Sequence, residues 1–296
     1  GSSGYKCKDA YLYANGKTQN MVAGGLAMDP THPAIKERIR ETAERFKRLG
    51  YEYIKIDFLT HGCAEADYYY DPEVQTGMQA YNKGMAYLLE QMEGMYITMA
   101  ISPLFPSQYA HSRRIACDAW AGIGDTEYTL NSLTYGWWLN QVYTYNDPDH
   151  LLLEPVSDGE NRARITSGVI TGIFMNGDDL SCISGIQVAK DKARKFLTNK
   201  DINAIAKMGK SFRPVSGNMD GADFLFMHDT GKEVYLAAFN YSGYDLTYDL
   251  PLSRLGLRES STYKAKELWS GKEVKFKKIV RVGIPKKDVL VFRITR

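Results

Sequence analysis

The stretch Tyr53-Ile-Lys-Ile-Asp57-Phe58 is among the most informative parts of this chain. It predicts a buried β-strand, over residues 51–59, that finishes on a carboxylate. Side chains alternate between the two faces of a strand, so Lys55 and Asp57 are expected on one face. A second stretch, Arg114-Ile-Ala-Cys-Asp118, predicts another strand end, with Arg114 and Asp118 sharing a face.

Strand-like and helix-like segments alternate from about residue 29 to 205. A helix that starts at Pro33 and stops at Gly50 has an apolar period of 3.6 residues. The further elements expected in order are a helix over 78–92, strands over 95–102 and up to 118, a helix over 130–139, a strand over 149–154, a helix over 161–172 opened by a Ser157–Glu160 capping box, a strand over 173–176, and a helix over 202–208 capped by Asp201. Repeated βα units with apolar strands favour a parallel sheet or a barrel.

The pattern changes after Pro214 to short strands separated by turn residues. The strands are expected over residues 222–227, 233–240, 246–250, 263–269 and 288–295. This spacing is typical of an antiparallel β-sandwich. We therefore expect two domains, residues 1–211 and 212–296.

Composition excludes several classes of function. The chain of 296 residues carries 37 basic and 35 acidic side chains, a net charge of +2, so no nucleic acid partner is expected. No apolar stretch approaches the ~18 residues that span a bilayer. The 4 cysteines show no metal-ligand spacing and are expected to be free thiols. There is no glycine-rich phosphate loop and no nucleophile elbow, and no metal or cofactor is expected.

The two strand ends supply the candidate catalytic groups. Lys55 would hold Asp57 ionised, as a nucleophile requires, although a Lys–Asp pair could equally serve to set strand register. Arg114 could bind a substrate hydroxyl while Asp118 donates a proton, although this motif taken alone favours an ordinary ion pair at a strand end. If the fold brings both strand ends to a single pocket, the carboxylates of Asp57 and Asp118 suit cleavage of a glycosidic bond.

Three further residues follow strand-like segments. Ser102 opens the loop Ser102-Pro-Leu104-Phe-Pro106, which is expected to be rigid and to lie over the same face. Asp149 belongs to Asn146-Asp-Pro-Asp149-His150, a motif that alone predicts no more than a turn. Trp120 is expected to pack in the core.

Four motifs in order resemble the melibiase-type α-galactosidase superfamily: Tyr-Ile-Lys-Ile-Asp57, Arg-Ile-Ala-Cys-Asp118, Asn-Asp-Pro-Asp149 and Ile-Phe-Met-Asn-Gly-Asp178. The resemblance runs from about Leu26 to the C-terminus. It implies a (β/α)8 barrel, in the α/β class, followed by an antiparallel β-sandwich, and hydrolysis of α-galactosides with retention of configuration.

By this resemblance, Asp57 is the nucleophile and Asp118 the general acid/base. Lys55 and Arg114 match the family's substrate-binding residues, while Asp149 and Ser102 are expected to contact the sugar. The loop with Ser102 lacks the acidic residue and tryptophan that the family often carries there, which would shift recognition at the sugar's second carbon.

Several alternatives stay open. The family's first strands lie upstream of the matched region, so residues 1–211 are expected to hold only the later barrel strands, as part of a longer protein. Related members cleave α-N-acetylgalactosaminides, β-L-arabinopyranosides or α-glucans. Two other hypotheses remain: a non-catalytic carbohydrate-binding protein, and an interaction module in the C-terminal sandwich. The oligomeric state and the compartment stay open, although secretion or a periplasmic location suits a glycan-degrading enzyme.

Overall fold

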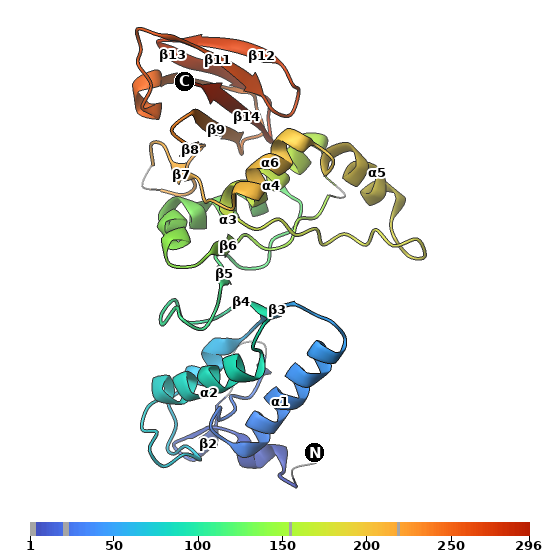
Figure 1. The fold of residues 1–296 in the computed structure, drawn as a ribbon, viewed down its shortest axis with the longest axis vertical. Helices are drawn as coiled ribbons and strands as arrows, with labels where there is room; N and C mark the ends of the chain where they lie inside the picture. The colour runs from blue at the N-terminus through green and yellow to red at the C-terminus, as the bar shows by residue number, and fades with distance from the viewer. Residues whose placement is uncertain (1–3, 20–23, 154–155, 218–219) are drawn as a thin grey trace. The chain divides into compact units, whose positions relative to one another are not determined.

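The computed structural model describes residues 4–19, 24–153, 156–217 and 220–296 (Figure 1). By packing, the chain divides into two compact units, Gly1–Arg113 and Arg114–Arg296. The domain boundary expected at residue 212 would separate the barrel from the C-terminal β-sandwich. It does not coincide with this division into compact units and stays a prediction.

The first unit contains two long helices and short strands. Its elements are η1 (Cys7–Ala10), β1 (Tyr13–Ala14), β2 (Lys17–Thr18), α1 (Pro33–Arg48), β3 (Tyr53–Ile56), η3 (Leu59–Cys63), α2 (Gly77–Gln91), β4 (Tyr96–Met99) and β5 (Ser112–Arg114), whose last residue crosses the division. Here η marks a 3₁₀ helix.

Local chemistry explains why α1 and α2 begin where they do. His32 caps α1 by accepting a hydrogen bond from the Ala34 amide through Nδ1 (3.1 Å), and Pro33 occupies the first helical position. Thr76 and Gln79 form a reciprocal capping box at the start of α2. The two helices predicted from apolar periodicity are thereby confirmed.

Strands β3, β4 and β5 of the first unit pair in parallel, whereas β1 and β2 pair antiparallel. Lys55 of β3 lies opposite Thr98 of β4, and Thr98 in turn lies opposite Ser112 of β5. This pairing agrees with the expected βα units. The strands are shorter than expected, since β3 ends at Ile56 and β4 at Met99. Phe58 has a left-handed backbone (φ 58°), which is incompatible with a continued strand.

In the part that the structure describes, the second unit contains four α-helices, two 3₁₀ helices, β6 and the C-terminal strands. Its helices are α3 (Ile123–Gly136), η4 (Trp137–Gln141), α4 (Asp158–Thr171), α5 (Gln187–Phe196), α6 (Lys200–Met208) and the short η5 (Leu252–Leu255). The capping box of Ser157 and Glu160 is confirmed at α4. The predicted cap of α6 is wrong: Asn199 accepts hydrogen bonds from the amides of Asp201 and Ile202 (3.0 and 3.1 Å).

Three strands between β4 and α5 differ from the sequence prediction. The strand expected to end at Asp118 ends at Arg114. The strand expected over 149–154 lies earlier, as β6 (Tyr145–Asp147); Glu154 lies outside the described residues. Pro148 has no amide N–H and Asp149 is left-handed (φ 71°), so a strand cannot run through them. The strand expected over 173–176 is reduced to one parallel bridge, between Leu151 and Asn176.

The described C-terminal strands form one antiparallel sheet of eight strands, in the order β10-β13-β12-β11-β14-β9-β8-β7. Their bounds are β7 (Arg213–Pro214), β8 (Leu225–Asp229), β9 (Glu233–Asn240), β10 (Leu246–Pro251), β11 (Thr262–Glu267), β12 (Glu273–Lys277), β13 (Ile279–Ile284) and β14 (Asp288–Thr295). Strands β12 and β13 were not among the expected strands. In β12 the outer positions are charged, and burial is limited to Phe276 and partly Val274.

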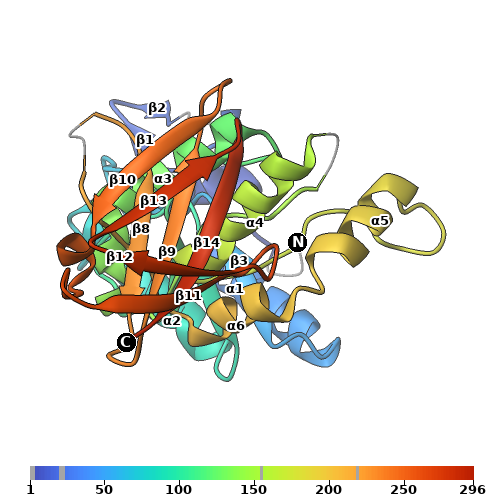
Figure 2. The same cartoon turned by 90° about the horizontal axis from the view of Figure 1, so that it is seen from above.

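The sheet folds over on itself and so encloses a core. Figure 2 shows β11 and β12 crossing over β8 and β9, and one cluster of buried side chains joins these strands, including Phe276, Leu236 and Met227. The opposite face carries Phe239 and Val291, which belong to a second cluster with helices α3, α4 and α6. Alternate residues of each strand therefore supply two separate cores.

The side chain of Phe239, fully buried in the core against α4, sets a test of this arrangement. Phe239→Ala should lower the free energy of unfolding by about 3–5 kcal/mol, because it leaves a cavity. Tyr244→Ala, at a position 67% exposed, should change it by no more than about 0.5 kcal/mol. Urea unfolding followed by tryptophan fluorescence measures both, and all 4 tryptophans (Trp120, Trp137, Trp138 and Trp269) lie in the second unit. Equal stability of the two variants would contradict the described core.

Candidate active site

The first unit places Lys55 and Asp57 at the carboxyl end of β3. Lys55 is half-buried within the strand, and Asp57 is exposed as the first residue after it. The Asp57 carboxylate accepts a hydrogen bond from the amide of Phe58 (2.7 Å), which orients it at the turn. An exposed, oriented carboxylate at this edge of a parallel sheet is accessible to a ligand.

Ser102 lies on the loop that follows the neighbouring strand β4. The amide of Thr60 donates to the carbonyl of Ile101 (2.9 Å), so the loops after β3 and β4 are joined. The Ser102 hydroxyl is buried, with no hydrogen-bond partner among the residues that the structure describes. A buried hydroxyl without such a partner can form a hydrogen bond with a bound ligand or a water molecule.

An apolar cavity of about 560 Å³ lies beside the turn that follows Asp57. Phe58, Leu59, Tyr81 and Met85 are among its lining residues. A sugar needs several polar partners for its hydroxyl groups, so this lining does not suit it.

In the second unit, Arg114 holds two carboxylates together. Its Nη2 lies 2.5 Å from Oδ1 of Asp118 and 3.1 Å from Oδ2 of Asp149. The side chain of Asp118 is 67% exposed, while those of Arg114 and Asp149 are 7% and 2% exposed. One end of this cluster is therefore anchored in the protein and the other faces solvent.

The charge of Arg114 is stabilised by this arrangement. Burial disfavours the charged guanidinium, but the hydrogen bond to Asp118 and the negative charges of Asp149, Asp118 and Asp147 outweigh that effect. The pKa of Arg114 is raised above its ordinary value as a result. Arg114 thus stays a fixed cation beside the exposed carboxylate.

The meeting of Arg114 and Asp118 has a different origin from the predicted one. Both were expected on one face of a strand, but the strand ends at Arg114 and Asp118 lies in the following loop. Asp149 shapes that loop, since its Oδ2 accepts a hydrogen bond from the amide of Ala119 (3.0 Å). A direct contact between Asp149 and a substrate stays a prediction, because its side chain is engaged inside the protein.

Arg164 is a site residue that sequence analysis missed. This fully buried arginine of α4 donates through Nη2 to the carbonyl oxygens of Pro148 (3.1 Å) and His150 (2.8 Å), and through Nη1 to Ser167 (3.1 Å). It therefore holds both sides of Asp149. Sequence reasoning could have found it, because Arg164 stands between the apolar residues Ala163 and Ile165 of a predicted helix. A charge buried there would need oxygen partners.

Burial sets the protonation behaviour of Arg164. Removal from water lowers its pKa to about 10, although the charges of Asp149, Asp125 and Asp147 oppose that shift. Arg164 therefore remains a cation at neutral pH, and its charge is spread over carbonyl and hydroxyl oxygens.

Trp120, His150 and Asp178 also lie near these residues in the chain. Trp120, expected in the core, is 54% exposed and follows Asp118 closely in the chain. His150 packs against Gly177, where an added Cβ would come within 2.7 Å of the imidazole. Next to this glycine, burial raises the pKa of Asp178, although its carboxylate accepts a hydrogen bond from the amide of Leu153 (3.1 Å).

The structure thus groups the predicted residues by unit. In the first unit, Lys55 lies in β3, and Asp57 and Ser102 lie on the two joined loops that follow β3 and β4. Arg114, Asp118 and Asp149 form a contiguous cluster in the second. Their individual roles stay predictions.

Comparison with known proteins supports the resemblance drawn from the motifs. The family model described as "Alpha galactosidase C-terminal beta sandwich domain" matches residues 225–294. Among solved structures, a β-L-arabinopyranosidase from Geobacillus stearothermophilus is similar with a TM-score of 0.73 and 14% identity, over 98% of this chain and 67% of that chain.

Two other solved structures are similar over nearly the whole chain. Alpha-galactosidase I from Mortierella vinacea has a TM-score of 0.62 and 12% identity, over 93% of this chain and 74% of that chain. An isomalto-dextranase from Arthrobacter globiformis T6, complexed with panose, has a TM-score of 0.62 and 17% identity, over 96% of this chain and 53% of that chain. At such identities these likenesses establish the fold.

The support that Arg164 gives to Asp149 can be tested by substitution. Arg164→Met leaves the carbonyl oxygens of Pro148 and His150 without their donor and should lower the free energy of unfolding by about 1–3 kcal/mol. It should also speed amide hydrogen exchange at Ala119 more than in the C-terminal sheet.

Arg194→Met is the matched control, because that side chain is 71% exposed and pairs only with Asp191 in the described part of the chain. It should leave both measurements nearly unchanged. A loss of stability in Arg164→Met with unchanged exchange at Ala119 would reduce Arg164 to a packing role.

Proposed function

We propose that this chain, which belongs to the melibiase-type α-galactosidase superfamily by its C-terminal domain and its fold, is a retaining glycoside hydrolase, foremost an exo-acting α-galactosidase. The observation that carries the proposal is the cluster of Arg114, Asp118 and Asp149. It offers solvent a carboxylate that is nevertheless fixed in place through a largely buried arginine. A catalytic acid/base requires both properties.

Asp57 is the proposed nucleophile. It is exposed at the carboxyl end of β3, and Lys55 on the same strand supplies a nearby positive charge. A carboxylate attacks only when ionised, which a neighbouring cation favours. The proposal requires that the carboxyl groups of Asp57 and Asp118 lie roughly 5–5.5 Å apart in the active enzyme, within a (β/α)8 barrel.

The proposed reaction has two steps. Asp57 attacks the anomeric carbon while Asp118 gives its proton to the departing oxygen, and a covalent glycosyl ester forms. Water then attacks the same carbon, with its proton passing to Asp118, and Asp57 leaves. Two inversions at one carbon retain the configuration.

Arg114 has to change partners during this cycle. Its bond to Asp118 stabilises a charged carboxylate, which suits the second step, in which Asp118 accepts a proton. In the first step Asp118 must carry a proton. A sugar hydroxyl that takes over the Arg114 guanidinium would release Asp118 for that role.

The choice of sugar is the finer part of the proposal. α-D-Galactopyranosides and β-L-arabinopyranosides share the same ring configuration. They differ in that only the galactopyranoside carries a hydroxymethyl group, with the primary hydroxyl, on C5. The loop after β4 carries Ser102, Leu104 and an exposed Phe105, a smaller polar surface than an acidic residue would provide. A 2-acetamido group is therefore an alternative to a 2-hydroxyl at this position.

Hydrolysis of aryl glycosides tests the proposal directly. The panel contains the α-galactoside, the α-N-acetylgalactosaminide, the β-L-arabinopyranoside and the α-glucoside. Asp57→Asn should lower kcat by about 10³-fold or more with a smaller effect on sugar affinity, because an amide cannot form the glycosyl ester. Asp191→Asn, on an exposed helix face, should match the unaltered chain. Wild-type turnover in Asp57→Asn would remove Asp57 from the proposed role.

Asp118→Ala should discriminate between leaving groups. On alkyl glycosides, whose leaving oxygen needs a proton, turnover should fall about 10²–10⁴-fold. On nitrophenyl glycosides the first step should be much less affected, and added azide should speed the second step. Equal losses on both substrate types, with no response to azide, would argue against Asp118 as the acid/base.

A further inference from the structure

The unit Arg114–Arg296 contains a second cavity, away from the cluster of Arg114, Asp118 and Asp149. Its volume is about 610 Å³, within the range of small-molecule sites. It is formed where the C-terminal sheet meets helices α4 and α5, and its lining includes Arg162, Phe196, Trp269, Gly283 and Asp288. The cavity therefore has aromatic, charged and apolar walls.

Trp269 is a fixed aromatic wall of this cavity. Its Nε1 donates to the buried hydroxyl of Thr166 on α4 (3.1 Å), and the ring of Phe196 packs edge-on against it at 6.1 Å. The indole is half-buried, so it also keeps accessible surface along the cavity. An aromatic ring held in this way loses little conformational entropy when a flat apolar surface stacks on it.

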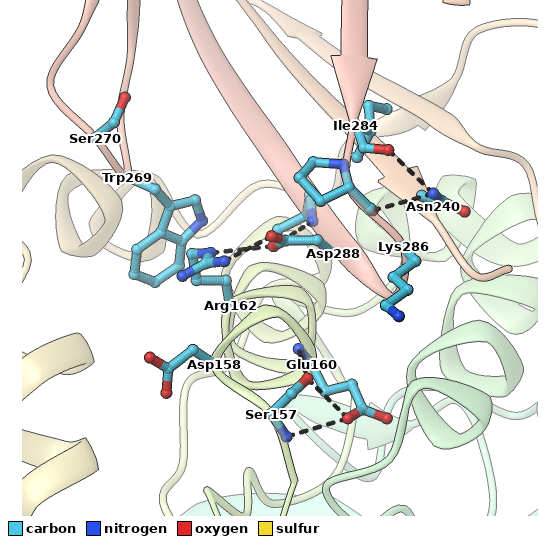
Figure 3. Close-up of polar contacts among 12 residues, drawn as sticks. Ser157, Asp158, Glu160, Arg162, Asn240, Trp269, Ser270, Ile284, Lys286 and Asp288 are labelled. Atoms are coloured by element: carbon cyan, nitrogen blue, oxygen red, sulfur yellow. Dashed lines mark hydrogen bonds and ion pairs between the residues drawn. The ribbon is translucent and has the colours of Figure 1, made fainter. Parts of the chain in front are cut away.

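Arg162 and Asp288 supply planar polar groups beside the indole (Figure 3). Nε and Nη2 of Arg162 bond to the two carboxylate oxygens of Asp288, at 3.0 and 2.6 Å. The arginine side chain is 27% exposed and the aspartate 7%. With respect to the described residues, this fork leaves Nη1 of Arg162 as a donor for a ligand.

Among the four basic residues that line the cavity, Arg162, Lys195 and Arg281 are paired with carboxylates, and Lys272 is the fourth. Lys195 lies 2.5 Å from Asp158, Arg281 pairs with Asp249, and Arg162 pairs with Asp288. An anionic ligand would have to compete with these carboxylates. A neutral ligand that offers hydroxyl groups and one apolar ring face meets no such competition.

We propose that this cavity is a second saccharide-binding site, which takes one neutral pyranose residue of a glycan. The ring of the sugar stacks on Trp269, and neighbouring hydroxyls bond to Arg162 and Asp288. The inference rests on the proposed function only in that a glycan substrate would supply the ligand. The site would raise the affinity for long glycans by engaging them at two points.

Two different changes test this site. Trp269→Ala removes the stacking surface, but it also removes the bond to Thr166. Gly283→Phe fills the cavity instead, at a position where an added Cβ meets no atom within 4 Å. Trp138→Ala, at an exposed tryptophan of η4, and Gly243→Phe, at an equally open glycine, are the matched controls.

Affinity for polysaccharides is measured in the Asp57→Asn background, so that the probes are not consumed. The probes are galactomannan, dextran and dextran sulfate. Both Trp269→Ala and Gly283→Phe should weaken binding to a neutral probe at least about tenfold. Both changes, with Asp57 intact, should leave hydrolysis of a small aryl glycoside unchanged, and the controls should alter neither measurement.

The outcomes separate this inference from the proposed function. Polysaccharide binding that depends on Trp269 and Gly283 in a chain without any hydrolysis would uphold the second site and overturn the enzyme. Hydrolysis with polysaccharide binding unaffected by either change would overturn the second site alone. Binding of dextran sulfate through these residues without binding of the neutral probes would also overturn it.

Discussion

The burial of Arg164 is the constraint on which the second unit's site depends. A guanidinium removed from water must find oxygen partners, and it finds them in the backbone on both sides of Asp149. Those bonds hold Asp149 in a left-handed conformation (φ 71°) with its carboxylate inside the protein. Asp149 then anchors Arg114, and Arg114 fixes the exposed Asp118. The position of the exposed Asp118 carboxylate thus depends on the buried charge of Arg164, through Asp149 and Arg114.

Helix α4 connects this site to the rest of the unit. Arg164 serves the loop that carries Asp149, while Ile165 and Val169 pack into the core beneath the C-terminal sheet. Arg162 and Thr166, one helical turn apart, bond to Asp288 and Trp269 on the sheet side. From Ala163 to Thr171 every residue of the helix is buried, so several of its faces contact other parts of the unit.

Prediction from sequence succeeded where interactions are local. The starts of α1, α2 and α4 follow from caps formed within three residues, and β9 and β14 contain apolar runs, over residues 234–239 and 289–292. It failed where the backbone leaves the regular conformation. The left-handed residues Phe58 and Asp149 shortened or displaced the expected strands, and their apolar or acidic character does not reveal a positive φ.

Sequence alone was enough to place Lys55 and Asp57 near the end of one strand, to predict the alternation of strands and helices and the antiparallel C-terminal region, and to reveal the resemblance to a glycosidase superfamily. The tertiary structure was needed to show that Asp118 contacts Arg114 from the loop after β5, that the buried Asp149 pairs with Arg114, and that Trp269 lines a cavity. The physical reason is sequence separation. Ala119 and Asp149 are 30 residues apart and Trp269 and Thr166 are 103 apart, so no local pattern encodes their contacts. Such contacts form only when the buried cores bring distant segments together.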